Sequence, residues 1–204
     1  MFVLSTALAR AAASVAGILL TATACGTGSP AAAPSTPPVS ATTDHSPLEP
    51  LVELSVSRIK TADEVSAAKF GTPSPIDDPA REQQVIAAAS AKAQTMQISP
   101  EEVTRFFRDQ IEANKVVQRG LYQQWTSHPD QRPGTKPDLA TVVRPELDRL
   151  TDQIMDSLKA TVPARHAGAG CTSALRRATE EAGRHLDQLH QQALTVATGS
   201  VCTG

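Results

Sequence analysis

Apolar side chains recur at helical spacing across residues 98–125 and predict one long helix there. Ser99 is a natural N-cap, Pro100 suits the first helical position, and Glu102 stands where a capping box places its carboxylate. The apolar residues expected on the buried face of this helix are Val103, Phe107, Ile111, Leu121 and Trp125. We therefore expect this helix to lie at the centre of the fold.

Two carboxamides interrupt that apolar face, because Asn114 and Gln118 fall on the same row, one turn apart. A buried carboxamide without a hydrogen-bond partner costs about 1–3 kcal/mol, so the pair needs a common explanation. Either the two side chains bind neighbouring helices in an internal polar network, or they face a ligand. The helix by itself leaves both interpretations open.

The same spacing predicts further helices before and after this one. The first extends from about Pro50 to Phe70, and the second begins where Asp78 can cap it and Pro79 takes its first position. Residues 127–137 are rich in proline and should form a loop.

Pro145 restricts Arg144 and removes a backbone donor, so the next regular helix should start or kink there. Its expected buried row is Leu147, Leu150, Ile154 and Leu158. A second loop is predicted at 163–170, ahead of a C-terminal helical segment. Because helix formers abound and β-branched alternation is scarce, we expect an all-α fold, with a single helical domain at 48–204.

Cations occupy unusual positions on the first two predicted helices. On the first helix, Arg58 and Lys69 share one face, and the small side chains of Ala62 and Val65 lie between them on that face. In an arbitrary pair of Arg or Lys residues on one helix, the charged ends more often extend into solvent than line a binding site. Arg81, however, lies in the first turn of the second helix, where a cation opposes the helix dipole, and Val85 follows one turn below. This placement favours a functional role for Arg81.

The N-terminal 47 residues have the composition of an export signal and a tether. Residues 1–24 carry one cation, Arg10, ahead of an apolar run that is too short to span a membrane stably. The sequence ATACG around Cys25 resembles a lipobox, in which the cysteine is acylated, and an ordinary cleavage site near Ala24 is the alternative. Residues 25–47 predict a disordered tether rich in Ser, Thr, Pro and Ala. We expect an exported protein, lipid-anchored through Cys25 outside the cytoplasmic membrane, or secreted.

The three cysteines can be sorted by their positions. If Cys25 carries a lipid, Cys171 and Cys202 remain as one disulfide pair in an oxidising compartment. A straight helix across that interval would separate their Cα atoms by on the order of 40 Å, whereas a disulfide needs about 7 Å or less. The C-terminal helix must therefore turn back on itself, with Gly183 as the break and Asp187 as the cap of the returning helix.

Composition excludes several classes of function. The net charge of −2 argues against a nucleic-acid partner. The chain has no CxxC, HExxH, Walker, GxSxG or GxGxxG motif, and its five histidines are scattered. Without a motif for a nucleophile, metal or cofactor, any chemistry would have to be electrostatic.

Several blocks of the sequence resemble the all-helical AroQ class of chorismate mutases. They are RDQIEANKVVQ at 108–118, PIDDPAREQQV at 75–85, and Arg58 with Lys69 eleven residues on. The tail RHLDQLHQQALTVAT, which closes on Cys202, resembles the exported subgroup of that class. The resemblance implies conversion of chorismate to prephenate by an intramolecular Claisen rearrangement, without a cofactor or metal. The subgroup also suggests a homodimer, with the pocket inside one polypeptide.

The resemblance assigns the principal contacts to four side chains. Arg58 and Arg144 would clamp the two carboxylates of the substrate, for which the guanidinium fork is suited. Lys69 and Gln118 would donate to the ether oxygen, which gains negative charge as its bond to carbon breaks, and Lys69 would also donate to a carboxylate. Mycobacterial members carry Glu at the position of Gln118, and an acid must be protonated before it can donate. We therefore expect activity here to persist above neutral pH.

Five further residues complete the implied substrate site. Asn114 would lie near a carboxylate, Arg81 would add positive potential, and Asp78 and Glu82 would hold the ring hydroxyl. Val85 would form part of the wall. The alternative from another functional class is a non-catalytic helical envelope lipoprotein that binds an anionic metabolite or a partner. Binding without turnover would favour that alternative.

Overall fold

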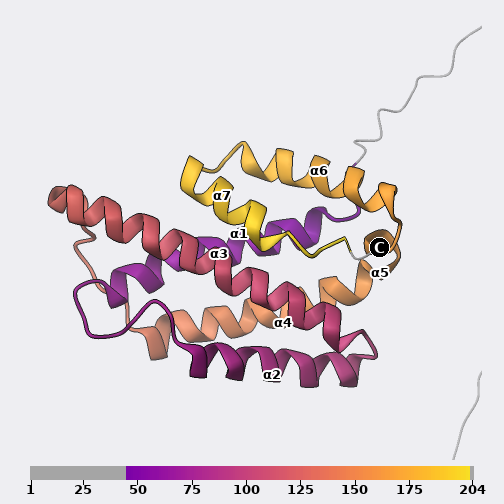
Figure 1. Cartoon of the computed structure of the whole chain (residues 1–204), viewed down its shortest axis with the longest axis horizontal. Coiled ribbons are helices and arrows are strands. Elements are labelled where there is room, and N and C mark those ends of the chain that lie inside the picture. The colour runs from indigo at the N-terminus through magenta and orange to yellow at the C-terminus, as the bar shows by residue number, and fades with distance from the viewer. Residues whose placement is uncertain (1–44, 203–204) are drawn as a thin grey trace, which may run out of the picture. The chain divides into compact units, whose positions relative to one another are not determined.

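The computed structural model describes residues 45–202, and its regular elements in that range are all helical (Figure 1). The principal helices are α1 (Glu49–Lys69), α2 (Pro79–Met96), α3 (Pro100–Ser127), α4 (Arg144–Ala160), α6 (Ala169–Gly183) and α7 (Gln188–Ala197). The short elements are the 3₁₀ turn η1 (Pro129–Gln131), the π-helical turn η2 (Leu139–Val143) and α5 (Val162–Arg165). The predicted signal peptide, Cys25 and most of the predicted tether lie outside the described residues.

Helix α3 is the central element, as predicted, and packs against α1, α2 and α7. Ser99 caps it by accepting a hydrogen bond from the Glu102 amide at 3.2 Å. Three of the five expected core residues are fully buried: Val103, Phe107 and Trp125. Ile111 and Leu121 are only partly buried. The buried apolar residues that the predicted stripe missed are Phe106, Ala113 and Val117. Contact with several helices widens the buried face beyond a single row.

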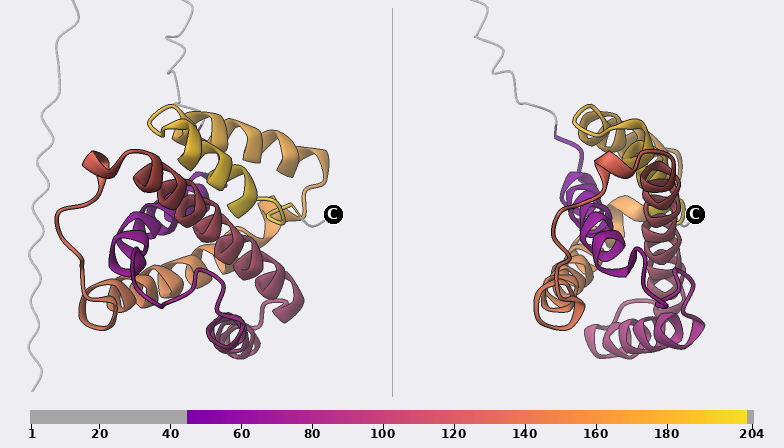
Figure 2. Two further views of the ribbon diagram at one scale, coloured as in Figure 1. Left: turned by 60° about the vertical axis from the view of Figure 1, so that its left-hand side comes forward. Right: turned by 90° about the vertical axis from the view of Figure 1, so that its left-hand side faces the viewer.

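Helix α2 lies at the edge of the bundle, opposite the α6–α7 hairpin (Figures 1 and 2). Asp78 caps it as predicted, accepting from the Arg81 amide at 3.0 Å. Only Ala89 and Ala93 on this helix are fully buried. Helix α2 therefore has little apolar anchorage and rests mainly on α3, with a smaller contact to α4.

The segment before α4 begins with a cap, because Asp138 Oδ1 accepts from the Ala140 and Thr141 amides at 2.8 Å. A π-helical turn then leads into α4, which begins at Arg144 with Pro145 in its first turn. The predicted helix start at Pro145 is confirmed. Of its expected buried row, three residues are fully buried and Leu147 is partly buried.

The predicted loop at 163–170 is interrupted by the short helix α5. Its Arg165 is buried and donates to Glu102 at 2.9 Å, and His166 lies 3.0 Å from the same carboxylate. These contacts hold the Glu102 carboxylate, so only the Ser99 half of the predicted capping box forms. The helix propensities of individual residues carry no information about this long-range ion pair between Arg165 and Glu102.

The C-terminal hairpin forms as predicted. Cys171 and Cys202 are joined by a disulfide with their Cα atoms 5.7 Å apart. Helix α6 ends at Gly183, and Asp187 caps α7 by accepting from the His190 amide at 2.9 Å. At the other end of the described chain, Ser46 is buried and donates to the Ala174 carbonyl at 2.8 Å, which attaches the start of α1 to this hairpin.

A buried histidine joins the hairpin to α1. His190 lies 3.1 Å from Asp63 of α1 and 2.7 Å from Asp187. The hydrogen bond with Asp63 raises the pKa of His190, and Asp187 adds to this effect against the opposing influence of burial. When protonated, the imidazole bridges the carboxylates of Asp63 and Asp187.

We expect His190→Gln to destabilise the protein more at pH 5.5 than at pH 8.5. Stabilisation by a raised pKa is fully present below the unfolded-state value of about 6.5 and is lost as pH rises through the folded-state value. Urea unfolding at both pH values measures the difference in free energy between variant and parent. His185→Gln, in the exposed turn before α7, is the matched control. An equal loss at both pH values would contradict the charged bridge.

Candidate active site

Four helices, α1 to α4, and the turn η2 surround a pocket of about 560 Å³. This volume falls within the range of roughly 300–1,000 Å³ that is typical of small-molecule sites. All nine residues predicted to bind the substrate lie on its wall: Arg58, Lys69, Asp78, Arg81, Glu82, Val85, Asn114, Gln118 and Arg144. Helical spacing places some of these side chains on the faces of α1 and α3 that line the pocket, so residues far apart in the sequence lie around one cavity.

Arg58 is a deeply buried cation of the pocket, with 7% of its surface exposed. Its guanidinium packs over the Phe107 ring at 5.7 Å and donates to Thr151 Oγ1 at 3.3 Å. Burial lowers the pKa of Arg58 to about 10, against an opposing effect of Asp148, so the group stays protonated at neutral pH. Within residues 45–202 it forms no salt bridge. A desolvated charge is costly unless it is paired, so this guanidinium favours an anionic ligand.

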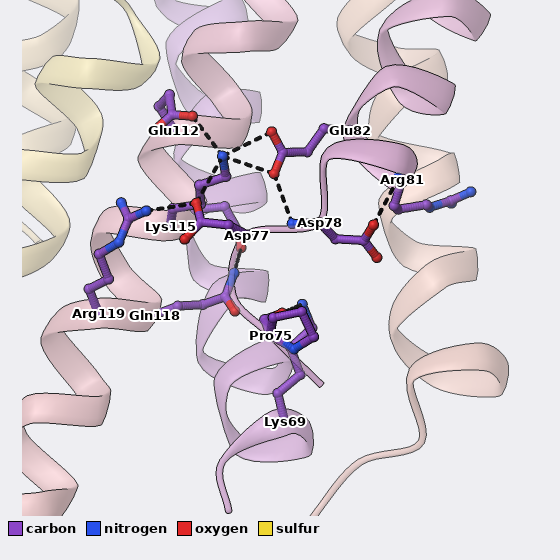
Figure 3. A network of polar contacts seen from close by, with 11 residues as sticks. Lys69, Pro75, Asp77, Asp78, Arg81, Glu82, Glu112, Lys115, Gln118 and Arg119 are labelled. Atoms are coloured by element: carbon purple, nitrogen blue, oxygen red, sulfur yellow. Dashed lines mark hydrogen bonds and ion pairs between the residues drawn. The ribbon is translucent and has the colours of Figure 1, made fainter. Parts of the chain in front are cut away.

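Lys69 is the last residue of α1, and its Nζ donates to the Pro75 carbonyl at 2.8 Å (Figure 3). Burial lowers the pKa of this half-exposed ammonium, while Asp78, Glu82 and Asp77 oppose that effect. The contact with Pro75 places the ammonium under the loop that leads into α2.

Asn114 and Gln118 bind each other on the pocket wall, with Gln118 Nε2 donating to Asn114 Oδ1 at 2.7 Å. Gln118 is almost fully buried, and its Oε1 has no hydrogen-bond partner in the described part of the chain. Both interpretations of the polar row therefore contain part of the answer. The carboxamides pair with each other, and they also face the pocket.

Arg81 and Arg144 lie in the first turns of α2 and α4 and line the same pocket. Both side chains are exposed, and Arg81 Nη1 donates to Gln84 at 3.2 Å. The N-terminus of a helix carries a positive partial charge, which adds to that of a nearby cation. The two arginines oppose the stability of their own helices and raise the positive potential of the pocket.

Two acidic residues of the pocket, Asp78 and Glu82, already have protein partners (Figure 3). Glu82 accepts from the Asp78 amide at 3.1 Å and from Lys115 at 2.9 Å. Asp78 uses Oδ1 to cap α2. Sequence reasoning missed Lys115, which also lines the pocket. The sequence shows Glu112 three residues before Lys115, at the spacing of a helical ion pair. It gives no sign of the partners of Lys115 on other segments, Asp77 and Glu82.

The described part of the chain shows neither a metal site nor a membrane-spanning helix. No cluster of three or more His, Cys, Asp or Glu side chains in that part of the chain is arranged to hold a metal ion. None of the helices described between residues 45 and 202 has the length and apolar character needed to cross a bilayer.

Comparison with known proteins identifies the family. The secreted chorismate mutase of Mycolicibacterium smegmatis is 38% identical over 161 residues, which cover 78% of this chain and 88% of that relative. The chain belongs to the chorismate mutase family. Residues 49–119 match the family description "Chorismate mutase type II". The secreted chorismate mutase of Mycobacterium tuberculosis is 34% identical over 172 residues, covering 83% of this chain and 85% of that protein.

Solved chorismate mutases share the fold as well. The Burkholderia phymatum enzyme matches with a TM-score of 0.69 and 37% identity, over 78% of this chain and 97% of that one. The Burkholderia thailandensis enzyme gives a TM-score of 0.73 and 34% identity, over 77% and 99%. The predicted all-α AroQ-type fold is confirmed. The family match from 49 to 119 contains eight of the nine proposed substrate contacts, and Arg144 of α4 lies beyond it.

Proposed function

We propose that this protein is an exported isomerase, a chorismate mutase that rearranges chorismate to prephenate. The observation that carries the proposal is the buried Arg58 guanidinium, without a salt bridge inside the described chain, in a pocket that also holds Lys69, Arg81 and Arg144. A small dicarboxylate supplies the charge that this arrangement lacks. Membership of the chorismate mutase family supports that choice.

The proposed reaction is unimolecular, because one carbon–oxygen bond breaks as a carbon–carbon bond forms within the same molecule. No proton, nucleophile or cofactor is needed, so the protein must bind a chair-like conformer and stabilise developing charge. Arg58 and Arg144 are assigned to the two carboxylates, which bidentate guanidinium contacts hold in a fixed orientation. The substrate is thereby restricted to the reactive geometry.

Lys69 and Gln118 are assigned to the ether oxygen, which becomes more negative in the transition state. Lys69 would exchange its contact with the Pro75 carbonyl for the ligand, or share its three donors between them. Gln118 has a second hydrogen on Nε2 beyond the one given to Asn114. If Asn114 donated to Gln118 Oε1 instead, that buried oxygen would gain a partner and both Nε2 hydrogens would be available.

The remaining contacts define the rest of the proposed site. Arg81 supplies positive potential, and Asn114 is assigned a place near a carboxylate of the substrate. Glu82 already accepts hydrogen bonds from Lys115 and from the Asp78 amide. The ring hydroxyl of the substrate would therefore bind the remaining acceptor positions of Glu82 or of Asp78. Val85 forms apolar wall.

Lys69→Ala should lower kcat for chorismate by about two to three orders of magnitude, as expected for loss of one donor to a developing oxyanion. Prephenate formation by the purified protein, without added metal, measures the effect. Lys60→Ala, an exposed lysine on the same helix, is the matched control and should leave kcat unchanged. Chorismate binding without turnover by the parent protein would instead support the non-catalytic alternative.

Gln118→Glu should convert a flat pH profile into a steep one. The amide donates at any pH, whereas glutamate must be protonated to donate to the ether oxygen, so kcat/KM of the variant should fall as pH rises from 6 to 8. The parent should keep its kcat/KM over that range. A steep loss in the parent itself would contradict the role proposed for Gln118.

Export is supported by the relatives named as secreted chorismate mutases. We also propose a lipid anchor on Cys25, following the predicted signal at 1–24, on the strength of the lipobox-like sequence. The proposed homodimer rests on family resemblance, and the pocket does not require it, since one chain supplies every proposed contact.

A fatty-acid analogue supplied to growing cells should label the protein at Cys25. Labelling should disappear in Cys25→Ser, because no other residue is expected to receive the lipid. Gel fluorescence after purification measures incorporation, with Ser29→Ala in the same predicted tether as the control. Labelling that persists in Cys25→Ser would exclude this anchor.

A further inference from the structure

We propose that Lys115 is a positioning residue that holds the loop before α2 in place and thereby sets the position of Lys69. The proposal rests on the proposed mutase function, but half of its test does not. Lys115 itself is not among the residues assigned to the substrate, although its partner Glu82 is. Its role follows from where its three carboxylate partners lie.

The ammonium of Lys115 stands at a junction of three segments (Figure 3). It lies 2.8 Å from Glu112 of α3, 2.9 Å from Glu82 of α2 and 3.3 Å from Asp77 of the α1–α2 loop. Only 9% of the side chain is exposed. Burial acts to lower the pKa of Lys115, but hydrogen bonds with the three carboxylates outweigh it and raise that pKa. The charge is therefore permanent at physiological pH.

Two of these partners control the loop directly. Glu82 accepts from the Asp78 amide at 3.1 Å, and Asp77 accepts from Arg119 of α3 at 2.8 Å as well as from Lys115. The loop from Pro75 to Asp78 is thus fastened to α3 by its own carboxylate and by that of Glu82.

The fastened loop ends at two groups of the proposed site. The Pro75 carbonyl receives Lys69 Nζ at 2.8 Å, and Asp78 caps the turn that carries Arg81. Helix α2 has little apolar anchorage at this end, because its fully buried residues, Ala89 and Ala93, lie farther along and Val85 is only partly buried. Without Lys115, three carboxylates would face one another with Arg119 as the remaining nearby cation of the network. Like charges repel, so the loop should move away from α3.

Lys115→Met should keep the length and apolar stem of the side chain while removing its charge. We expect kcat/KM to fall by about 10- to 100-fold, the scale of a displacement near 1 Å in a catalytic group. Lys115→Arg should retain most of the parent value, since it can still bind the carboxylates. In the Lys69→Ala background the same Lys115→Met change should cost clearly less than in the parent, because much of its effect passes through Lys69.

Hydrogen exchange of the 71–82 segment tests the loop without reference to catalysis. In Lys115→Met the amides of Asp78 and Arg81 should exchange faster, while the α6–α7 hairpin stays protected. Lys60→Met, an exposed lysine on α1, is the control for the chemical change and should leave both readouts at parent values. Asp77→Asn, at a half-exposed partner, should give a smaller effect of the same kind and serves if Lys115→Met fails to fold.

Three results would overturn the proposal: an unchanged kcat/KM in Lys115→Met, an unchanged exchange rate at 71–82, or a full multiplicative loss in the Lys69→Ala background. If the parent protein proves inactive on chorismate, the proposed function fails by itself. Faster exchange in Lys115→Met would then still establish that Lys115 holds the loop.

Discussion

A buried positive charge without a buried negative partner is the constraint on which this site depends. Arg58 is held inside the helical bundle by Phe107 and Thr151, neither of which neutralises it. Folding must cover the desolvation cost of that guanidinium, and the packing of α1 against α3 and α4 holds it in place. An anion that enters the pocket recovers part of that cost. The protein is thus prepared in advance for a negatively charged ligand, which is the electrostatic preorganisation that a reaction without covalent catalysis requires.

Some charges of the pocket are paired within the protein. Asp77, Glu82 and Glu112 pair with Lys115, which lines the pocket together with Glu82. This pairing limits how far these acidic residues neutralise Lys69, although Asp78, Glu82 and Asp77 still oppose the lowering of its pKa. The ion pairs of Lys115 help to hold the start of α2 against α3, a role that apolar packing has for the other helices, because α2 contributes few fully buried residues to the core.

Much of this could be predicted from the sequence, for identifiable reasons. Caps at Asp78, Ser99 and Asp187 are local signals, and each forms as expected. The disulfide forces the C-terminal hairpin, and helical periodicity brings Arg58 and Lys69 to one face. Periodicity also indicated that Asn114 and Gln118 needed a joint explanation.

What could not be predicted depends on contacts between distant segments. Arg165 reaches Glu102 from a segment expected to be a loop, and that contact takes the carboxylate away from the predicted capping box. No role was predicted for Lys115, because the loop that brings Asp77 to it has no periodic pattern. The full width of the buried face of α3 likewise depends on how many helices surround it, which its own sequence does not encode.

One feature of the pocket bears on where such a protein can work. All nine residues proposed to bind the substrate belong to one polypeptide, with α4 contributing Arg144. A site shared between subunits is lost when a dilute protein dissociates. A self-contained site keeps its shape however sparse the molecules become, which suits a protein that works outside the cell that made it.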